Sequence, residues 1–85
     1  MNPRILLVDD DPHLLAGLKR QLRRRFQVTT ASGGEEALAR LTDQEPFTVV
    51  VADYRMPGMN GIDLLARIKT VQPDTVRMML TGAAD

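Results

Sequence analysis

The stretch VADYRMPGMNG, residues 51–61, carries an apolar run into a single acid, Asp53, and then turns the chain with a Pro-Gly pair. The run covers residues 47–52, and its three consecutive valines are typical of a strand that is buried on both faces. A carboxylate that directly follows such a strand lies at the rim of a sheet. It either marks the point where the chain leaves the core or is presented there to react.

Outward from this stretch, short apolar runs alternate with amphipathic segments. We expect strands at residues 5–8, 26–30, 47–52 and 75–80, and helices at 12–25, from 32 to before 46, and from 60 to before 72. The order is βαβαβαβ. This alternation predicts an α/β fold, in which a parallel sheet has helices on both faces and right-handed connections.

Polar residues indicate where the helices begin. Asp11 before Pro12 is typical of an N-cap followed by Pro in the first turn. Ser32 to Glu35 match a capping box, and Asn60 is expected to cap the third helix. The inward residues of that third helix are expected to be Ile62, Leu65 and Ile68.

Length and composition restrict the function classes. The 85 residues make one small domain, 1–85, of which 44% are hydrophobic and 26% charged. The charges of eleven basic and eleven acidic residues cancel, so the chain has no net positive charge that would favour binding to nucleic acid. Without cysteines there is neither a disulfide framework nor a thiolate metal site. No apolar run is long enough to span a membrane, and the start has no secretory signal. We therefore expect a cytoplasmic domain that binds neither nucleic acid nor membrane directly.

Polar groups follow three of the predicted strands. Asp9 and Asp10 come after the first strand, Asp53 after the third and Thr81 after the fourth. Ligands of open parallel sheets bind outside the carboxyl ends of the strands, so these groups converge if strands one, three and four are neighbours. Three carboxylates repel one another unless a cation lies among them. Because the donors are oxygens, with no His or Cys, the cluster favours Mg²⁺ over zinc.

Such a site suits phosphoryl transfer. Asp53 stands alone after its strand and is the best candidate for a nucleophile toward phosphorus, which would give an aspartyl phosphate. Asp9 and Asp10 form a pair suited to holding metal, and the Thr81 hydroxyl could donate to a phosphoryl oxygen. Taken singly, each residue has an ordinary explanation as a turn or a cap. Their coincidence at the ends of strands favours the site.

Three motifs resemble the receiver domain of two-component response regulators. ILLVDDDP at 5–12 resembles the first strand and acid pair of that family, VVVADYRMPGMNGIDLL at 49–65 its phosphoacceptor strand with the D-x-x-M-P pattern, and TVRMMLTG at 75–82 its fourth strand. The resemblance spans essentially all of the chain. It implies a flavodoxin-like sheet with strand order 2-1-3-4-5.

The resemblance also implies roles for individual residues. Asp53 would accept a phosphoryl group from the phosphohistidine of a histidine kinase or phosphotransfer protein. Mg²⁺ would be bound by Asp10, Asp53 and the backbone carbonyl of Arg55, with Asp9 helping through water. Thr81 would contact the bound phosphoryl group. The implied function is a phosphorelay step ahead of an unknown output domain, without turnover of an external substrate.

A complete receiver continues through a fourth helix, a fifth strand and a fifth helix, with a Lys that pairs with the phosphoryl group. Lys19 and Lys69 lie in predicted helices and cannot be that Lys by position. We therefore expect a C-terminally truncated receiver. The open edge of its fourth strand and the uncovered apolar surface favour pairing with another chain, as in a homodimer.

Two other interpretations stay open. A fragment without the Lys could be unable to accept phosphate and act as a metal-binding, partner-binding or dimerising module. Asp53→Asn distinguishes this from the first interpretation, since only a phosphoacceptor loses its function. A phosphohydrolase of the haloacid dehalogenase type also uses an Asp nucleophile and Mg²⁺. It requires a second Asp two residues later, and this chain has Arg55 there.

Overall fold

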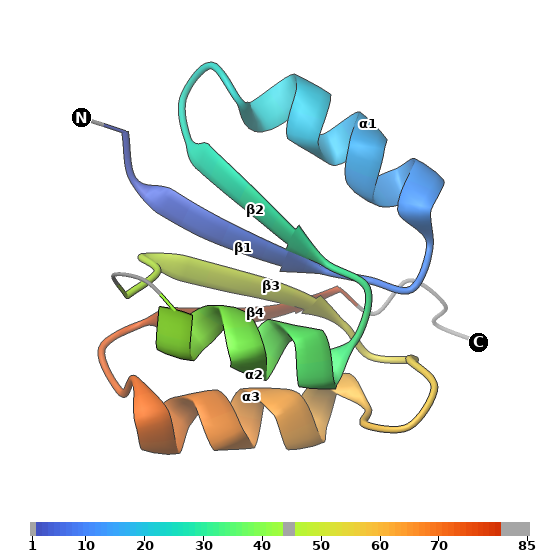
Figure 1. The fold of residues 1–85 in the computed structure, drawn as a ribbon, viewed down its shortest axis with the longest axis vertical. Coiled ribbons are helices and arrows are strands. Elements are labelled where there is room, and N and C mark those ends of the chain that lie inside the picture. The colour runs from blue at the N-terminus through green and yellow to red at the C-terminus, as the bar shows by residue number, and fades with distance from the viewer. Residues whose placement is uncertain (1, 44–45, 81–85) are drawn as a thin grey trace.

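The computed structural model describes residues 2–43 and 46–80, in which strands and helices alternate. The strands are β1 (Arg4–Val8), β2 (Gln27–Ala31), β3 (Val49–Asp53) and β4 (Val76–Leu80), and the helices are α1 (Pro12–Leu22), α2 (Gly34–Asp43) and α3 (Gly61–Val71). The strands form one parallel sheet in the order β2-β1-β3-β4. Helix α1 covers one face, and α2 and α3 cover the other (Figure 1). The predicted α/β fold with helices on both faces is confirmed.

The strand order explains the apolar pattern of each strand. β1 lies inside the sheet between β2 and β3, and four of its five residues are buried, which accounts for its continuous apolar run. β2 lies at one edge and is more polar. β3 begins at Val49, two residues later than expected, and ends on Asp53 itself. Phe47 lies before the strand, but only 2% of its surface is exposed. This residue therefore belongs to the hydrophobic core although it is not part of the sheet.

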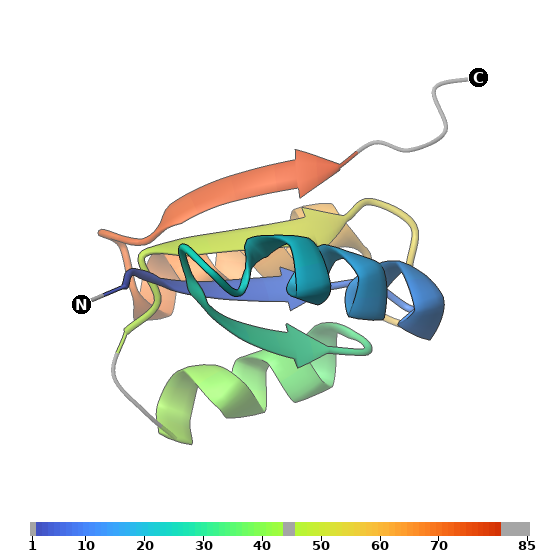
Figure 2. The same ribbon diagram turned by 90° about the horizontal axis from the view of Figure 1, so that it is seen from above.

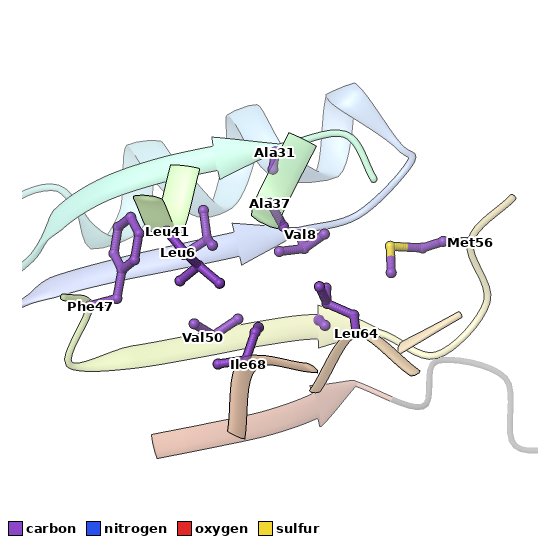
Figure 3. Packing of buried hydrophobic residues seen from close by; sticks show 11 residues of the cluster. Leu6, Val8, Ala31, Ala37, Leu41, Phe47, Val50, Met56, Leu64 and Ile68 are labelled. Atoms are coloured by element: carbon purple, nitrogen blue, oxygen red, sulfur yellow. The ribbon is translucent and has the colours of Figure 1, made fainter. Parts of the chain in front are cut away.

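Each face of the sheet has an apolar cluster of its own. The larger one lies between the sheet and α2 and α3 (Figure 3). Its buried members are Leu6, Val8, Ala31, Ala37, Leu41, Phe47, Val50, Ala52, Met56, Leu64 and Ile68. The smaller one, on the α1 face, has Ile5, Leu7 and Leu15 as its buried members. The α1 face is therefore the less completely covered of the two.

The start of α1 is as predicted, and its end is earlier. The Asp11 side chain accepts hydrogen bonds from the backbone N–H of His13 at 2.9 Å and of Leu14 at 3.3 Å. The helix ends at Leu22, and not near Arg25, because the apolar stripe stops there and the three arginines that follow are exposed. No helix in the described ranges is long and apolar enough to cross a membrane.

The capping interaction at the start of α2 differs from the predicted one. Glu36, not Glu35, reaches back to Ser32, and one carboxylate oxygen accepts from both the N–H and the hydroxyl of Ser32 at 2.8 Å. The reason is that α2 begins at Gly34, one residue later than the capping box assumes. The acid that points back along the helix is therefore one residue later as well.

At the start of α3, Asn60 is the N-cap as predicted, and its side chain accepts from the N–H of Asp63 at 2.9 Å. The predicted inward position of Ile62 is wrong, because its side chain is 53% exposed. The predicted inward position of Ile68 is confirmed, because this side chain is fully buried, and Leu65 packs partly buried against the larger apolar cluster. Leu64, which was not predicted, is fully buried as well. Leu64 and Ile68 are about one turn apart on the same side of the helix, whereas Ile62 lies about 160° around from Leu64 on a helix of 3.6 residues per turn.

Candidate metal centre

The structure brings three of the predicted site residues together. Asp9 and Asp10 follow β1, and Asp53 is the last residue of β3. These two strands are neighbours, with Val8 beside Ala52 in the register, so the residues that follow meet at the same edge of the sheet. One carboxylate oxygen from each acid lies within 4.8 Å of the other two.

Asp9 is the most buried acid of the cluster, with 7% of its surface exposed. Burial raises the pKa of its carboxyl, and the negative charges of Asp53 and Asp10 raise it further, while a hydrogen bond from the backbone of Asp11 lowers it. The ionised cluster therefore has repulsion that a cation would offset. All three donors are carboxylate oxygens, the ligands that Mg²⁺ prefers, so the residues fit this metal.

Asp11 supports the cluster from the start of α1, a role that the sequence did not indicate. Its backbone N–H donates to Oδ1 of Asp9 at 2.9 Å, while its side chain caps the helix. The helix cap and the orientation of Asp9 are thus coupled through a single residue. In the sequence, only the run of three acids before Pro12 pointed to this role. The spacing of these acids could not show whether Asp11 caps the helix, orients Asp9, or does both.

A cavity of about 370 Å³ opens beside the cluster. Its lining residues are Asp10, Tyr54, Arg55, Met56, Pro57 and Asn60. Arg55, whose backbone carbonyl was predicted as a metal ligand, therefore lines the same cavity as Asp10. Met56 is 7% exposed and belongs to the larger apolar cluster, so it anchors the loop between β3 and α3 in the core.

Gly61 allows α3 to begin directly against the backbone of Asp53. Its N–H donates to the carbonyl of Tyr54 at 3.0 Å. A Cβ at this position would lie 2.5 Å from the carbonyl oxygen of Asp53, closer than real Cβ contacts allow. Gly58 gives the turn in the same loop with φ of +81°, a conformation that L side chains rarely adopt. Two glycines therefore shape the loop that holds the candidate nucleophile.

The predicted phosphoryl contact, Thr81, lies outside residues 2–43 and 46–80. The strand that leads to it is well placed, because Leu80 is the register neighbour of Asp53. The N–H of Tyr54 also donates to the carbonyl of Leu80 at 3.2 Å. The end of β4 is thus beside the acid cluster.

The profile of the response regulator receiver domain matches residues 5–85. The chain belongs to this family. As a receiver, it is a module of two-component signalling. Its four-stranded parallel sheet agrees with solved receivers such as the chemotaxis protein CheY4 of Vibrio cholerae. That structure has a TM-score of 0.91 and 27% sequence identity, and the match covers all of this chain and 72% of that one.

Two further relatives are closer in sequence. A structure described as adenylate cyclase from Rhodopirellula baltica is 48% identical, with a TM-score of 0.92 over 95% of this receiver and 60% of that chain. The transcriptional regulatory protein PrrA of Mycobacterium leprae is 39% identical over 95% of this receiver and 35% of its own length. The receiver spans 17% to 35% of the length of the first curated relatives that it matches.

Proposed function

We propose that this receiver accepts a phosphoryl group on Asp53 from a phosphohistidine of a partner kinase or phosphotransfer protein. The observation that carries the proposal is the approach of Asp9, Asp10 and Asp53 to within 4.8 Å at the carboxyl ends of two neighbouring strands. Asp53 is half-buried at the end of β3, so the sheet positions it while part of its surface stays accessible to a donor. The residues that directly follow it line the cavity together with Asp10.

In the proposed step, a carboxylate oxygen of Asp53 forms a bond to phosphorus while the bond between phosphorus and the histidine nitrogen breaks. The nitrogen leaves with the electron pair, and the product is a mixed anhydride on Asp53. The reaction occurs once per chain. We therefore propose that the receiver is modified stoichiometrically and does not turn over an external substrate.

We propose Asp9, Asp10, Asp53 and the backbone carbonyl of Arg55 as the residues that hold Mg²⁺. When bound, Mg²⁺ would offset the negative charge that the phosphoryl group brings to the acid cluster. Asp9 holds its orientation through the hydrogen bond from Asp11, and Asp10 faces the cavity. Thr81 is proposed to donate its hydroxyl proton to a phosphoryl oxygen. The expected setting is the cytoplasm, with an output domain that reads the phosphorylated state.

The test is intact mass after incubation with Mg²⁺ and acetyl phosphate, a small donor that needs no kinase. We expect the wild type to gain one phosphoryl group and Asp53→Asn to gain none. Asp63→Asn is the matched control, because this acid is exposed in the first turn of α3 and lies outside the acid cluster. A gain in Asp53→Asn equal to that of the wild type would overturn the assignment.

Beryllofluoride separates binding from chemistry. The DrrB receiver, 34% identical over all of this chain and 70% of that one with a TM-score of 0.87, is described in a BeF3-activated form. We expect a bound ¹⁹F resonance in the wild type with Mg²⁺, and none in Asp53→Asn or in EDTA. A folded chain that binds Mg²⁺ yet shows neither phosphorylation nor bound beryllofluoride would favour the alternative function, a metal-binding or dimerising module.

A further inference from the structure

A groove of about 400 Å³ opens between α2 and α3, which lie side by side on the face of the sheet opposite α1 (Figure 1). Figure 2 shows that the described end of β4 lies at the other end of the sheet from the ends of α2 and α3. The groove is therefore remote from both the acid cluster and the end of β4. Its lining residues are Leu38, Leu41, Thr42, Arg67, Thr70 and Val71.

The size of the groove suits a compact ligand. Its lining comes from one turn of each helix, at positions i, i+3 and i+4 on both. One turn rises only about 5.4 Å along the axis, which is too short to hold a partner helix lengthwise. The volume lies within the usual range for small-molecule sites, about 300–1,000 Å³. The shape therefore favours a small molecule over a helix of another protein.

Contacts within the chain hold the walls of the groove in place. Leu41 is 3% exposed in the larger apolar cluster, and Leu38 packs partly buried against that cluster. The Gln72 side chain donates from Nε2 to the carbonyl of Leu41 at 3.1 Å, which ties the end of α3 to α2. The same side chain accepts from the hydroxyl of buried Thr75 at 3.1 Å. A ligand therefore meets a site that is already formed, as is usual for small-molecule sites.

Arg67 determines which charge the groove accepts. Its side chain is exposed and forms no ion pair within the described part of the chain. The hydroxyls of Thr42 and Thr70 donate to carbonyls of their own helices, so their oxygens remain as acceptors. Among the described lining residues, Arg67 is thus the only one with a charge. Because α2 and α3 both end nearby, their carbonyl ends disfavour an anion unless it pairs with Arg67.

We propose that this groove binds a small organic acid. The apolar body of the ligand contacts Leu38, Leu41 and Val71, and its carboxylate pairs with the guanidinium of Arg67. A guanidinium presents two parallel N–H groups to a carboxylate, which suits this pairing. The buried apolar surface contributes most of the affinity, and the exposed ion pair selects the sign of the charge.

Three probes with the same apolar body test the charge: phenylbutyrate, phenylbutanol and phenylbutylamine. In an NMR titration, we expect phenylbutyrate to bind most tightly and to shift the amides of residues 38–42 and 67–72. Arg67→Gln should weaken phenylbutyrate several-fold and leave phenylbutanol unchanged. Arg20→Gln is the matched control and should change neither, because Arg20 is also an exposed helical arginine but lies on α1. Equal binding of phenylbutylamine and phenylbutyrate, or an equal loss in both variants, would overturn the proposal.

Val71→Trp tests the groove itself. Val71 is 55% exposed, so a Trp can fill the groove without displacing a core residue. We expect a folded Val71→Trp, checked by urea unfolding, to lose the binding of all three probes. Unchanged binding in this variant, or no shift of the wild type with millimolar phenylbutyrate, contradicts the proposal.

The same amides distinguish a second copy of the chain from a small molecule. Shifts that grow with protein concentration, without any probe, would mean that a second copy fills the groove, and they too would overturn the proposal. Asp53→Asn should bind phenylbutyrate like the wild type. The outcome is therefore independent of the phosphorylation test.

Discussion

Gly61 and Gly17 show how differently one residue type can act in this fold. Gly61 begins α3 with its Cα against the backbone of Asp53, so any side chain would displace the strand end that carries the candidate nucleophile. Gly17 lies in the middle of α1, where a Cβ would meet nothing within 4 Å. The first glycine is needed for close approach, and the second only lowers helix propensity.

We therefore predict opposite effects of two alanine substitutions. Gly61→Ala should destabilise the chain by about 1–3 kcal/mol, the usual cost of overpacking, and slow phosphorylation by acetyl phosphate. Gly17→Ala should stabilise it by about 1 kcal/mol and leave the rate unchanged. Urea unfolding and the rate of mass gain measure both. A Gly61→Ala variant as stable and as reactive as the wild type would show that the start of α3 does not position Asp53.

The raised pKa of Asp9 indicates that the ionised form of its carboxyl destabilises the folded chain. A carboxyl whose pKa is higher in the folded chain than its usual value of 3.8 contributes stability that is complete below pH 3.8 and is lost as the pH rises through the raised value. At pH 7 in EDTA, Asp9→Asn should therefore raise the Tm. The asparagine oxygen can still accept the hydrogen bond from Asp11.

The control for this prediction is Asp63→Asn, an exposed acid outside the cluster. It should change the Tm little in EDTA and leave the response to Mg²⁺ intact. Asp9→Asn should instead lose part of the Tm increase that Mg²⁺ gives the wild type. A lower Tm for Asp9→Asn in EDTA would mean that the charge of Asp9 favours the fold.

At the scale of the element, the start of α2 is stabilised by the side chain of Glu36. Glu36 accepts two hydrogen bonds from Ser32, and it forms an ion pair with Arg40 at 3.2 Å. The hydrogen bonds from Ser32 are the main reason that the pKa of Glu36 is lowered, and Arg40 adds to the effect. The contact at the start of α2 therefore favours the ionised form of the Glu36 carboxyl.

A lowered pKa gives the opposite pH dependence to that of Asp9. The contribution of Glu36 to stability is present above its usual pKa of 4.5 and is lost as the pH falls through the lowered value. We predict that the free energy of unfolding falls less on acidification in Glu36→Gln than in the wild type. In Glu35→Gln it should fall as much as in the wild type. The effect should be small, because the Glu36 side chain is 40% exposed and its charge is screened by solvent. Unfolding curves between pH 3 and pH 7 measure it, and parallel curves for Glu36→Gln and the wild type would contradict it.

At the scale of the whole molecule, the acid cluster joins two parts of the chain that are far apart in sequence. Asp9 and Asp10 follow the first strand, and Asp53 ends the third, which lies beside it in the sheet. A cation bound to all three is therefore available only to the folded chain. Binding of this kind stabilises the entire fold by mass action.

We predict that Mg²⁺ at about 100 times its Kd stabilises the wild type by about 2.7 kcal/mol. Thermal unfolding over a range of Mg²⁺ concentrations measures the shift, and Ca²⁺ and Na⁺ series show how selective it is. Asp53→Asn should reduce the shift strongly, while Asp63→Asn should not. A shift that is the same in all three chains would mean that Mg²⁺ acts elsewhere on the surface.

Much of this architecture could be predicted from the sequence, because it depends on local patterns. Helix caps at Asp11 and Asn60 and the buried run of β1 follow from residue types and spacing over one or two turns. The phase of α3 did not follow. Ile62 and Leu64 are both apolar, and only the packing of the helix on the sheet shows that Leu64 is the buried one. The one-residue offset at Ser32 and Glu36 likewise depended on where α2 begins.

The sequence by itself determined which elements form, in which order, and that acids stand at the ends of β1 and β3, because apolar periodicity and capping are local properties of the chain. Only the tertiary structure decided that these acids lie within 4.8 Å of one another, that Asp11 orients Asp9, and that Gly61 must be small. The separation of the acids and the close approach at Gly61 depend on strand order and helix docking, which bring distant parts of the chain together. The contact between Asp11 and Asp9 is local, but it depends on where the chain turns from β1 into α1.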